Sequence, residues 1–169
     1  MINYFNYFGL PVSMNIDQGI LRRLYYENSR KYHPDFYTLE PEKQQEEALR
    51  QSTLNNEAYK ILKDGEKRLR HLLEVKGAIK DGDKEILSQV FLMEMMDVNE
   101  AIMDVQQGDT SQKRLTDLNN EINTLTDKLN AEINEMGKTK LNESDIKSLK
   151  NCYFKLKYIK RLKGNISKL

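Results

Sequence analysis

The sequence is poor in the residues that build cross-linked or metal-centred proteins. One cysteine, Cys152, in 169 residues excludes a disulfide framework and an all-cysteine zinc site. Two histidines, His33 and His71, leave little for a histidine-rich metal site. No apolar run approaches the roughly 20 residues needed to cross a bilayer, and the N-terminus lacks the features of a signal peptide. We therefore expect a cytoplasmic protein without a metal, a cofactor or a membrane segment.

The sequence also lacks an excess of either positive or negative charge. Lys plus Arg number 27 and Asp plus Glu number 26, so the net charge is +1, and the mean hydropathy is −0.74. Such balance attracts no particular partner through bulk charge. Only eight glycines and three prolines interrupt the chain, and β-branched residues are sparse beside Leu, Lys, Glu and Asn. This composition predicts an all-α fold.

Apolar periodicity and the positions of Gly and Pro divide the chain into two domains. Helices are predicted over residues 4–8, 17–32, 41–62, 66–75, 84–106, 111–136 and 142–163. The one convincing linker, residues 77–83, separates an N-terminal domain (1–76) from a C-terminal domain (84–169). The last three helices have short connections, which predicts an antiparallel three-helix bundle.

The tripeptide His33-Pro34-Asp35 follows a helix rich in cations, Arg22, Arg23, Arg30 and Lys31. Pro34 ends that helix and restricts the loop, so less entropy is lost when the loop docks on a partner. Asp35 offers a carboxylate to a partner arginine, and the basic face favours an acidic surface. The simpler alternative is a proline that stops a helix and an aspartate that caps a turn.

The surroundings of this tripeptide resemble those in J-domains. A short Tyr-Phe helix and Gly9-Leu10-Pro11 precede it, and a helix ending in Glu57-Ala58-Tyr59-Lys60-Ile61-Leu62 follows it. J-domains bind DnaK-class chaperones and stimulate their ATP hydrolysis. The resemblance implies a helical hairpin with short flanking helices, in which the chaperone-binding residues are His33, Pro34, Asp35, Arg22, Arg23, Arg30 and Lys31.

The helix predicted over residues 84–106 carries two stripes. One has the spacing of a core face: Phe91, Met95, Val98, Ile102 and Val105. The other lies about 100° away and combines apolar with acidic residues: Leu92, Met93, Met96, Asp97, Glu100 and Asp104. Methionine adapts to irregular partner surfaces, so we interpret the second stripe as a protein-docking surface. A wide buried face with acids at its edge is the alternative.

The segment Phe91-Leu92-Met93-Glu94-Met95-Met96 resembles the opening of the C-terminal domain of HscB, the J-domain co-chaperone family of iron–sulfur cluster assembly. The chain looks like the bacterial type, because the cysteine-rich N-terminal extension of eukaryotic members is not present. The resemblance implies a non-enzymatic monomer that delivers the scaffold IscU to the chaperone HscA and assists cluster assembly and transfer. It implies scaffold-binding residues Leu92, Met93, Met96, Asp97, Glu100, Asp104 and Tyr158.

Acidic and basic residues are concentrated in different segments of the C-terminal half, and this has more than one explanation. Residues 81–109 hold eight acids and one base, and residues 146–169 hold eight bases and no acid. Attraction between helices of one bundle explains this, and we expect no nucleic-acid or membrane partner. The rival explanation is a nucleic-acid surface with interleaved aromatic residues, and a J-domain protein with another client is the second rival. We further expect a half-buried or solvated His71 and a packing role for Cys152.

Overall fold

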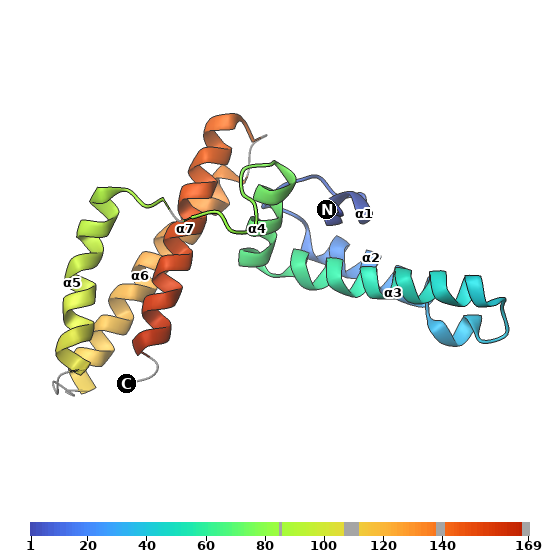
Figure 1. Cartoon of the computed structure of the whole chain (residues 1–169), viewed down its shortest axis with the longest axis horizontal. Coiled ribbons are helices and arrows are strands. Elements are labelled where there is room, and N and C mark those ends of the chain that lie inside the picture. Colours follow the sequence, from blue (N-terminus) through green and yellow to red (C-terminus); the bar gives the residue numbers. More distant parts are fainter. Residues whose placement is uncertain (85, 107–111, 138–140, 167–169) are drawn as a thin grey trace. The chain divides into compact units, whose positions relative to one another are not determined.

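The computed structural model describes residues 1–84, 86–106, 112–137 and 141–166, and within these ranges every regular element is helical (Figure 1). The predicted all-α fold is confirmed. The elements are α1 (Tyr4–Tyr7), α2 (Gln18–Lys31), the 3₁₀ helix η1 (Pro34–Tyr37), α3 (Glu42–Lys63), α4 (Gly65–Val75), α5 (Gln89–Gln106), α6 (Gln112–Met136) and α7 (Glu143–Ile166). They form two compact units, Met1–Gly77 and Ala78–Leu169.

The N-terminal unit is a hairpin of α2 and α3, which run in opposite directions, with α1 and α4 packed on α3 (Figure 1). Asn3 and Asp17 cap α1 and α2, and the Asp17 carboxylate accepts the backbone N–H of Gly19 at 2.7 Å. Gly9 ends α1 with a φ of +64°, a conformation that costs glycine little. The core consists of Phe5, Phe8, Met14, Leu21, Ala48, Ala58, Leu62, Leu69, Leu72 and Leu73.

The C-terminal unit consists of α5, α6 and α7, and successive helices run in opposite directions (Figure 1). The stripe predicted to face the core of this bundle is buried: Phe91, Met95, Val98, Ile102 and Val105 are each at most 5% exposed. Apolar residues of α6 and α7 complete the core: Leu118, Ile122, Leu129, Ile133, Leu149, Cys152, Phe154, Ile159, Leu162 and Ile166.

Three local expectations differ from the structure: the start of α5, the loop after His33 and the burial of His71. The helix predicted from Lys84 begins at Gln89, because Ser88 caps it: its Oγ accepts the N–H of Phe91 at 3.3 Å and its carbonyl accepts that of Leu92 at 3.0 Å. The expected loop after His33 contains the helical turn η1, for which Pro34 supplies a suitable φ.

His71 is buried rather than half-buried or solvated, with 4% exposed. Its Nε2 accepts the backbone N–H of Tyr4 at 3.0 Å, and its ring stacks on that of Tyr4 with centroids 4.6 Å apart. Burial lowers the pKa of His71, and the nearby carboxylate of Glu74 opposes this shift. The neutral imidazole therefore fastens α1 to α4.

Candidate functional site

The loop His33-Pro34-Asp35 begins two residues after the end of α2 and is exposed. His33 has the extended backbone expected before a proline, with φ −66° and ψ 125°. Its Nδ1 accepts the N–H of Asp35 at 3.4 Å, and its carbonyl accepts that of Phe36 at 3.0 Å. Because Nδ1 is engaged within the loop, Nε2 is the ring nitrogen left to meet a partner. The loop thus offers a partner one imidazole nitrogen and one carboxylate acceptor.

Contacts on both sides hold this loop in place. The Tyr37 hydroxyl donates to the carbonyl of Lys31 at 2.9 Å, which ties η1 to the end of α2. The Thr38 hydroxyl donates to the carbonyl of Asp35 at 3.3 Å. The Gln45 amide donates to the carbonyl of Glu40 at 2.8 Å, which ties the loop to α3. A loop that is already ordered loses less entropy when it docks.

The hairpin behind the loop is joined by a buried amide. Asn55, 1% exposed, donates from Nδ2 to the carbonyl of Tyr25 and to the hydroxyl of Ser29, both at 3.0 Å. The rings of Tyr25 and Tyr59 stack with centroids 4.2 Å apart, and the Tyr25 hydroxyl donates to Asn56 Oδ1 at 3.0 Å. These contacts fix α2 against α3 and hence the direction in which the loop points.

All four predicted cations of α2 are exposed. At about 100° per residue, Arg22, Arg23 and Arg30 share one face of the helix, whereas Lys31 lies about a quarter turn farther round. The Lys31 ammonium instead stands 5.0 Å from the centroid of the Tyr32 ring. All four predicted cations therefore lie on the exposed half of α2, spread over about half a turn.

A hollow of about 270 Å³ joins this basic face to the loop. Its lining includes the predicted residues Arg30, His33 and Asp35, together with Tyr26 and Phe36. The last two are 48% and 71% exposed, and neither was predicted from the sequence as a site residue. The signal for Tyr26 was its position one turn before Arg30, on the same face of α2. The site therefore contains aromatic surface as well as charge.

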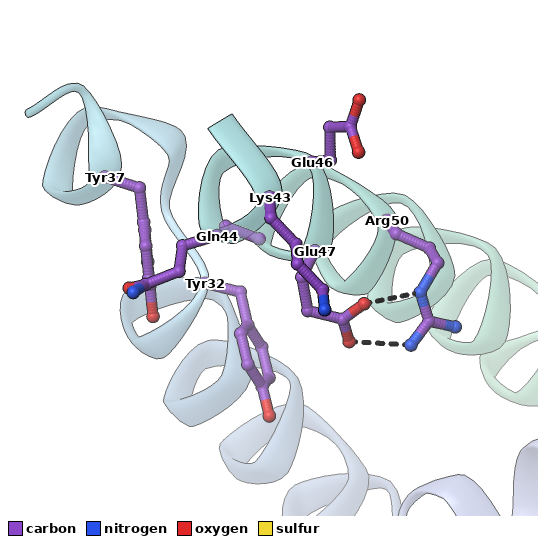
Figure 2. A pocket seen from close by; sticks show the side chains of 8 residues that line it. Tyr32, Tyr37, Lys43, Gln44, Glu46, Glu47 and Arg50 are labelled. Carbon is purple, nitrogen blue, oxygen red and sulfur yellow. Dashed lines mark hydrogen bonds and ion pairs between the residues drawn. The ribbon is translucent and has the colours of Figure 1, made fainter. Parts of the chain in front are cut away.

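A second hollow, of about 590 Å³, lies where the end of α2, η1 and the start of α3 meet (Figure 2). Tyr32 and Tyr37 line it from one side, and residues of α3 line it from the other. There the Glu47 carboxylate accepts from Arg50 Nε at 2.8 Å and from Nη2 at 2.6 Å, and these bonds lower the pKa of Glu47 to about 2. The hollow therefore combines two tyrosine rings on one side with the polar and charged side chains of α3 on the other.

The second stripe of α5 faces away from the core. Leu92, Met93 and Met96 are 41%, 63% and 65% exposed, and the three acids beside them, Asp97, Glu100 and Asp104, are exposed as well. The alternative of one wide buried face is therefore wrong. Exposed apolar side chains in a group, bordered by charge, are typical of a protein-binding surface.

Tyr158 of α7 lies beside this stripe and is half-buried. Asn99 Nδ2 donates to the Tyr158 hydroxyl at 3.0 Å and to the carbonyl of Met95 at 2.7 Å. The Tyr158 ring meets the Phe91 ring edge-on, with centroids 5.8 Å apart, and the Arg161 guanidinium lies 4.9 Å from its centroid. The structure thus brings Tyr158 to the edge of α5, as a member of one surface with the stripe.

The acid-rich α5 and the lysine-rich α7 contact each other, and the Lys155 ammonium stands 5.1 Å from the centroid of the Phe91 ring. This is a contact between a cation and an aromatic ring rather than an ion pair, so attraction between the opposite charges of the two helices stays a prediction. Cys152 is buried, and burial followed by the nearby Glu132 carboxylate raises its pKa to about 11. Its thiol stays protonated and packs in the core.

Among the described residues, no three or more His, Cys, Asp or Glu side chains gather as a metal ion would require. Within the same ranges, no helix combines the length and the apolar character needed to span a membrane.

The hairpin, the ordered loop and the basic helix face define a J-domain protein, and comparison with protein families agrees. Residues 3–71 match the DnaJ domain, and residues 87–167 match the family described as the HSCB C-terminal oligomerisation domain. The chain belongs to the HscB co-chaperone family, whose members are non-enzymatic J-domain proteins that deliver IscU to HscA and stimulate its ATPase in iron–sulfur cluster assembly.

The relatives cover the chain at moderate identity. A co-chaperone HscB homolog of Shewanella denitrificans is 33% identical over 118 residues, 69% of this chain and 68% of the relative. A homolog of Vibrio vulnificus is 26% identical over 166 residues, 98% of this chain and 95% of the relative. Two solved structures share the fold. HscB from Vibrio cholerae has a TM-score of 0.71 at 24% identity, covering 99% of this chain and 96% of its own. Human HscB has a TM-score of 0.76 at 22% identity, covering 99% and 82%.

Proposed function

We propose that two surfaces of this chain bind two different proteins. A DnaK/HscA-class ATPase binds at the loop and basic helix face, through His33, Pro34, Asp35, Arg22, Arg23, Arg30 and Lys31. An IscU-type scaffold binds at α5 and the adjoining edge of α7, through Leu92, Met93, Met96, Asp97, Glu100, Asp104 and Tyr158. The first surface belongs to a J-domain of residues 1–76, the second to a bundle of residues 84–169, and residues 77–83 link them.

The chaperone surface works by complementarity rather than by chemistry of its own. The Asp35 carboxylate accepts from a basic group of the ATPase, and the His33 Nε2–H donates to an acceptor on it. Arg22, Arg23 and Arg30 steer an acidic face of the ATPase onto the loop, which raises the association rate at low salt. ATP is bound and hydrolysed on the partner.

The observation that carries the scaffold assignment is the open stripe of α5. Its side chains are exposed although the same helix buries a full core face on its other side. Apolar side chains give a docking surface its binding energy, and the adjacent carboxylates select orientation and partner. Because both surfaces lie on one chain, a bound scaffold reaches the ATPase at high effective concentration.

Substitutions in the loop test the chaperone assignment. His33→Gln and Asp35→Asn each remove one group from an exposed loop, so both variants should fold normally and lose stimulation of an HscA-class ATPase. Steady-state ATP hydrolysis measures this. Asp117→Asn, the same change at an exposed position of α6, is the control and should stimulate fully. Undiminished stimulation by either loop variant would refute the assignment.

We also propose that the protein acts in the cytoplasm as a monomer and without a nucleic-acid partner. The net charge of +1 and the contact of α5 with α7 support a role for the lysines within the bundle. The exposed apolar residues of α5 are accounted for by the scaffold. The family model for residues 87–167 carries oligomerisation in its description. Sedimentation equilibrium over a wide concentration range therefore tests the monomer, and a mass that doubles would contradict it.

A further inference from the structure

Met103 is an exposed apolar side chain on α5 to which the proposed function gives no role. It is 58% exposed, close to the 65% of Met96. Its neighbours Ile102 and Val105 occupy the core at 5% and 4% exposure, so the bundle does not need Met103. A surface helix normally carries polar residues opposite its buried face, and a long apolar side chain there requires another explanation.

Helical geometry places Met103 in line with the stripe. It comes seven residues after Met96, and seven residues make almost two full turns, so the two side chains share one face. Leu92 lies on this same face, one turn before Met96. From Leu92 to Met103 the strip extends along the helix axis for roughly 16 Å, at about 1.5 Å per residue.

The two long edges of this strip differ. Asn99, one turn before Met103, lies on the edge where its side chain holds the Tyr158 hydroxyl at 3.0 Å. Glu100 and Asp104 lie on the other edge and are exposed. Met103 therefore lies between the edge that contacts Tyr158 and the acidic edge. Met96 has the same position almost two turns earlier in the helix. Its flexible thioether side chain suits contact with an irregular partner surface.

We propose that the scaffold-docking surface continues to Met103, which is a further residue that determines affinity for the scaffold. The complementary surface of the scaffold is then an apolar strip of roughly 16 Å, bordered by lysine or arginine along the one edge that meets Glu100 and Asp104. This inference rests on the proposed binding of the scaffold to α5. It commits to the same partner, because the strip is continuous with that surface.

Titration calorimetry of the full chain with a purified IscU-type scaffold tests the inference. Met103→Ala and the similarly shaped but polar Met103→Gln should each weaken binding roughly five-fold, the usual loss for an anchor in an interface. Met103→Leu keeps an apolar side chain and should bind within about two-fold of the unaltered chain. Leu49→Ala is the matched control, since Leu49 of α3 is 59% exposed, and it should bind normally.

The outcomes separate the inference from the proposed function. Weakening by Met103→Ala and Met103→Gln, with thermal melting unchanged and Leu49→Ala unaffected, supports the longer surface. If these variants bind normally while Leu92→Ala and Met96→Ala weaken binding, the apolar strip ends at Met96 and the inference is wrong. If none of the four weakens binding, the scaffold does not dock on this stripe, and the proposed function fails with the inference.

Discussion

Truncation of two apolar side chains on α5 should weaken scaffold binding more than neutralisation of two acids beside them. The change is Leu92→Ala with Met96→Ala, compared with Asp97→Asn with Asp104→Asn. Full burial of a Leu or Met side chain is worth up to about 3 kcal/mol. Leu92 and Met96 are 41% and 65% exposed in the free protein, so the scaffold can bury only those fractions, worth at most about 1 and 2 kcal/mol.

The sum sets an upper limit of about 3 kcal/mol, or roughly a hundred-fold in the dissociation constant. The acidic pair lies at the rim and should change affinity only modestly, while flattening the dependence of the association rate on salt. Neither pair should lower the melting temperature much, because Phe91, Met95 and Val98 form the buried face of the helix.

Titration calorimetry at several ionic strengths, with a thermal melt of each variant, distinguishes these effects. A docking role of the stripe would be refuted if the Leu92 and Met96 double variant melted far earlier than the unaltered chain yet bound scaffold normally. The stripe would then serve folding rather than docking. A loss well above a hundred-fold would also contradict the area argument, because it exceeds what the exposed fractions allow.

Two further predictions concern groups that the sequence alone did not connect. His71 has a pKa below its usual 6.5, so the stability it contributes is present above that pH and is lost as the pH falls through the folded-state pKa. The free energy of unfolding in urea, measured at pH 7.5 and at pH 5, should show this loss. His71→Phe should be about 1–3 kcal/mol less stable than the unaltered chain at pH 7.5 and should lack this pH dependence. The same pH dependence in the variant and in the unaltered chain would contradict the role of His71. Asn99→Ala should weaken scaffold binding several-fold, because Asn99 positions Tyr158. Adding Tyr158→Phe to this variant should therefore cause little further loss of affinity. If calorimetry showed that the two losses of binding free energy add, Asn99 would not act through Tyr158.

Local patterns accounted for the His33-Pro34-Asp35 loop and for the faces of the helices. Pro34 fixes the end of α2 through its own ring, and the core stripe from Phe91 to Val105 follows from the helical repeat, so neither depends on distant parts of the chain. Periodicity also located Leu92, Met93 and Met96 on a second face. It could not establish that the bundle leaves this face open, because that depends on where α6 and α7 pack.

Contacts between residues distant in sequence were not predictable in the same way. His71 is buried by Tyr4, 67 positions away, and Asn99 holds Tyr158 across 59 positions. Neither pair leaves a periodic signal. The start of α5 was missed for a local reason: residues 84–87 have helix-compatible character, and only the cap formed by Ser88 shows that the helix begins later.

One chain couples an ATPase to a scaffold, and cutting the chain between its two units tests this coupling most directly. A protease site inserted after the exposed Gly77, the last residue of the first unit, leaves both units intact until cleavage, since exposed loops tolerate insertions. ATP hydrolysis by an HscA-class chaperone is then measured with and without IscU-type scaffold, before and after the cut. We predict that cleavage preserves the stimulation by the N-terminal unit and abolishes the additional stimulation by scaffold, because the gain in effective concentration is lost. Full scaffold-dependent stimulation after complete cleavage would contradict this coupling.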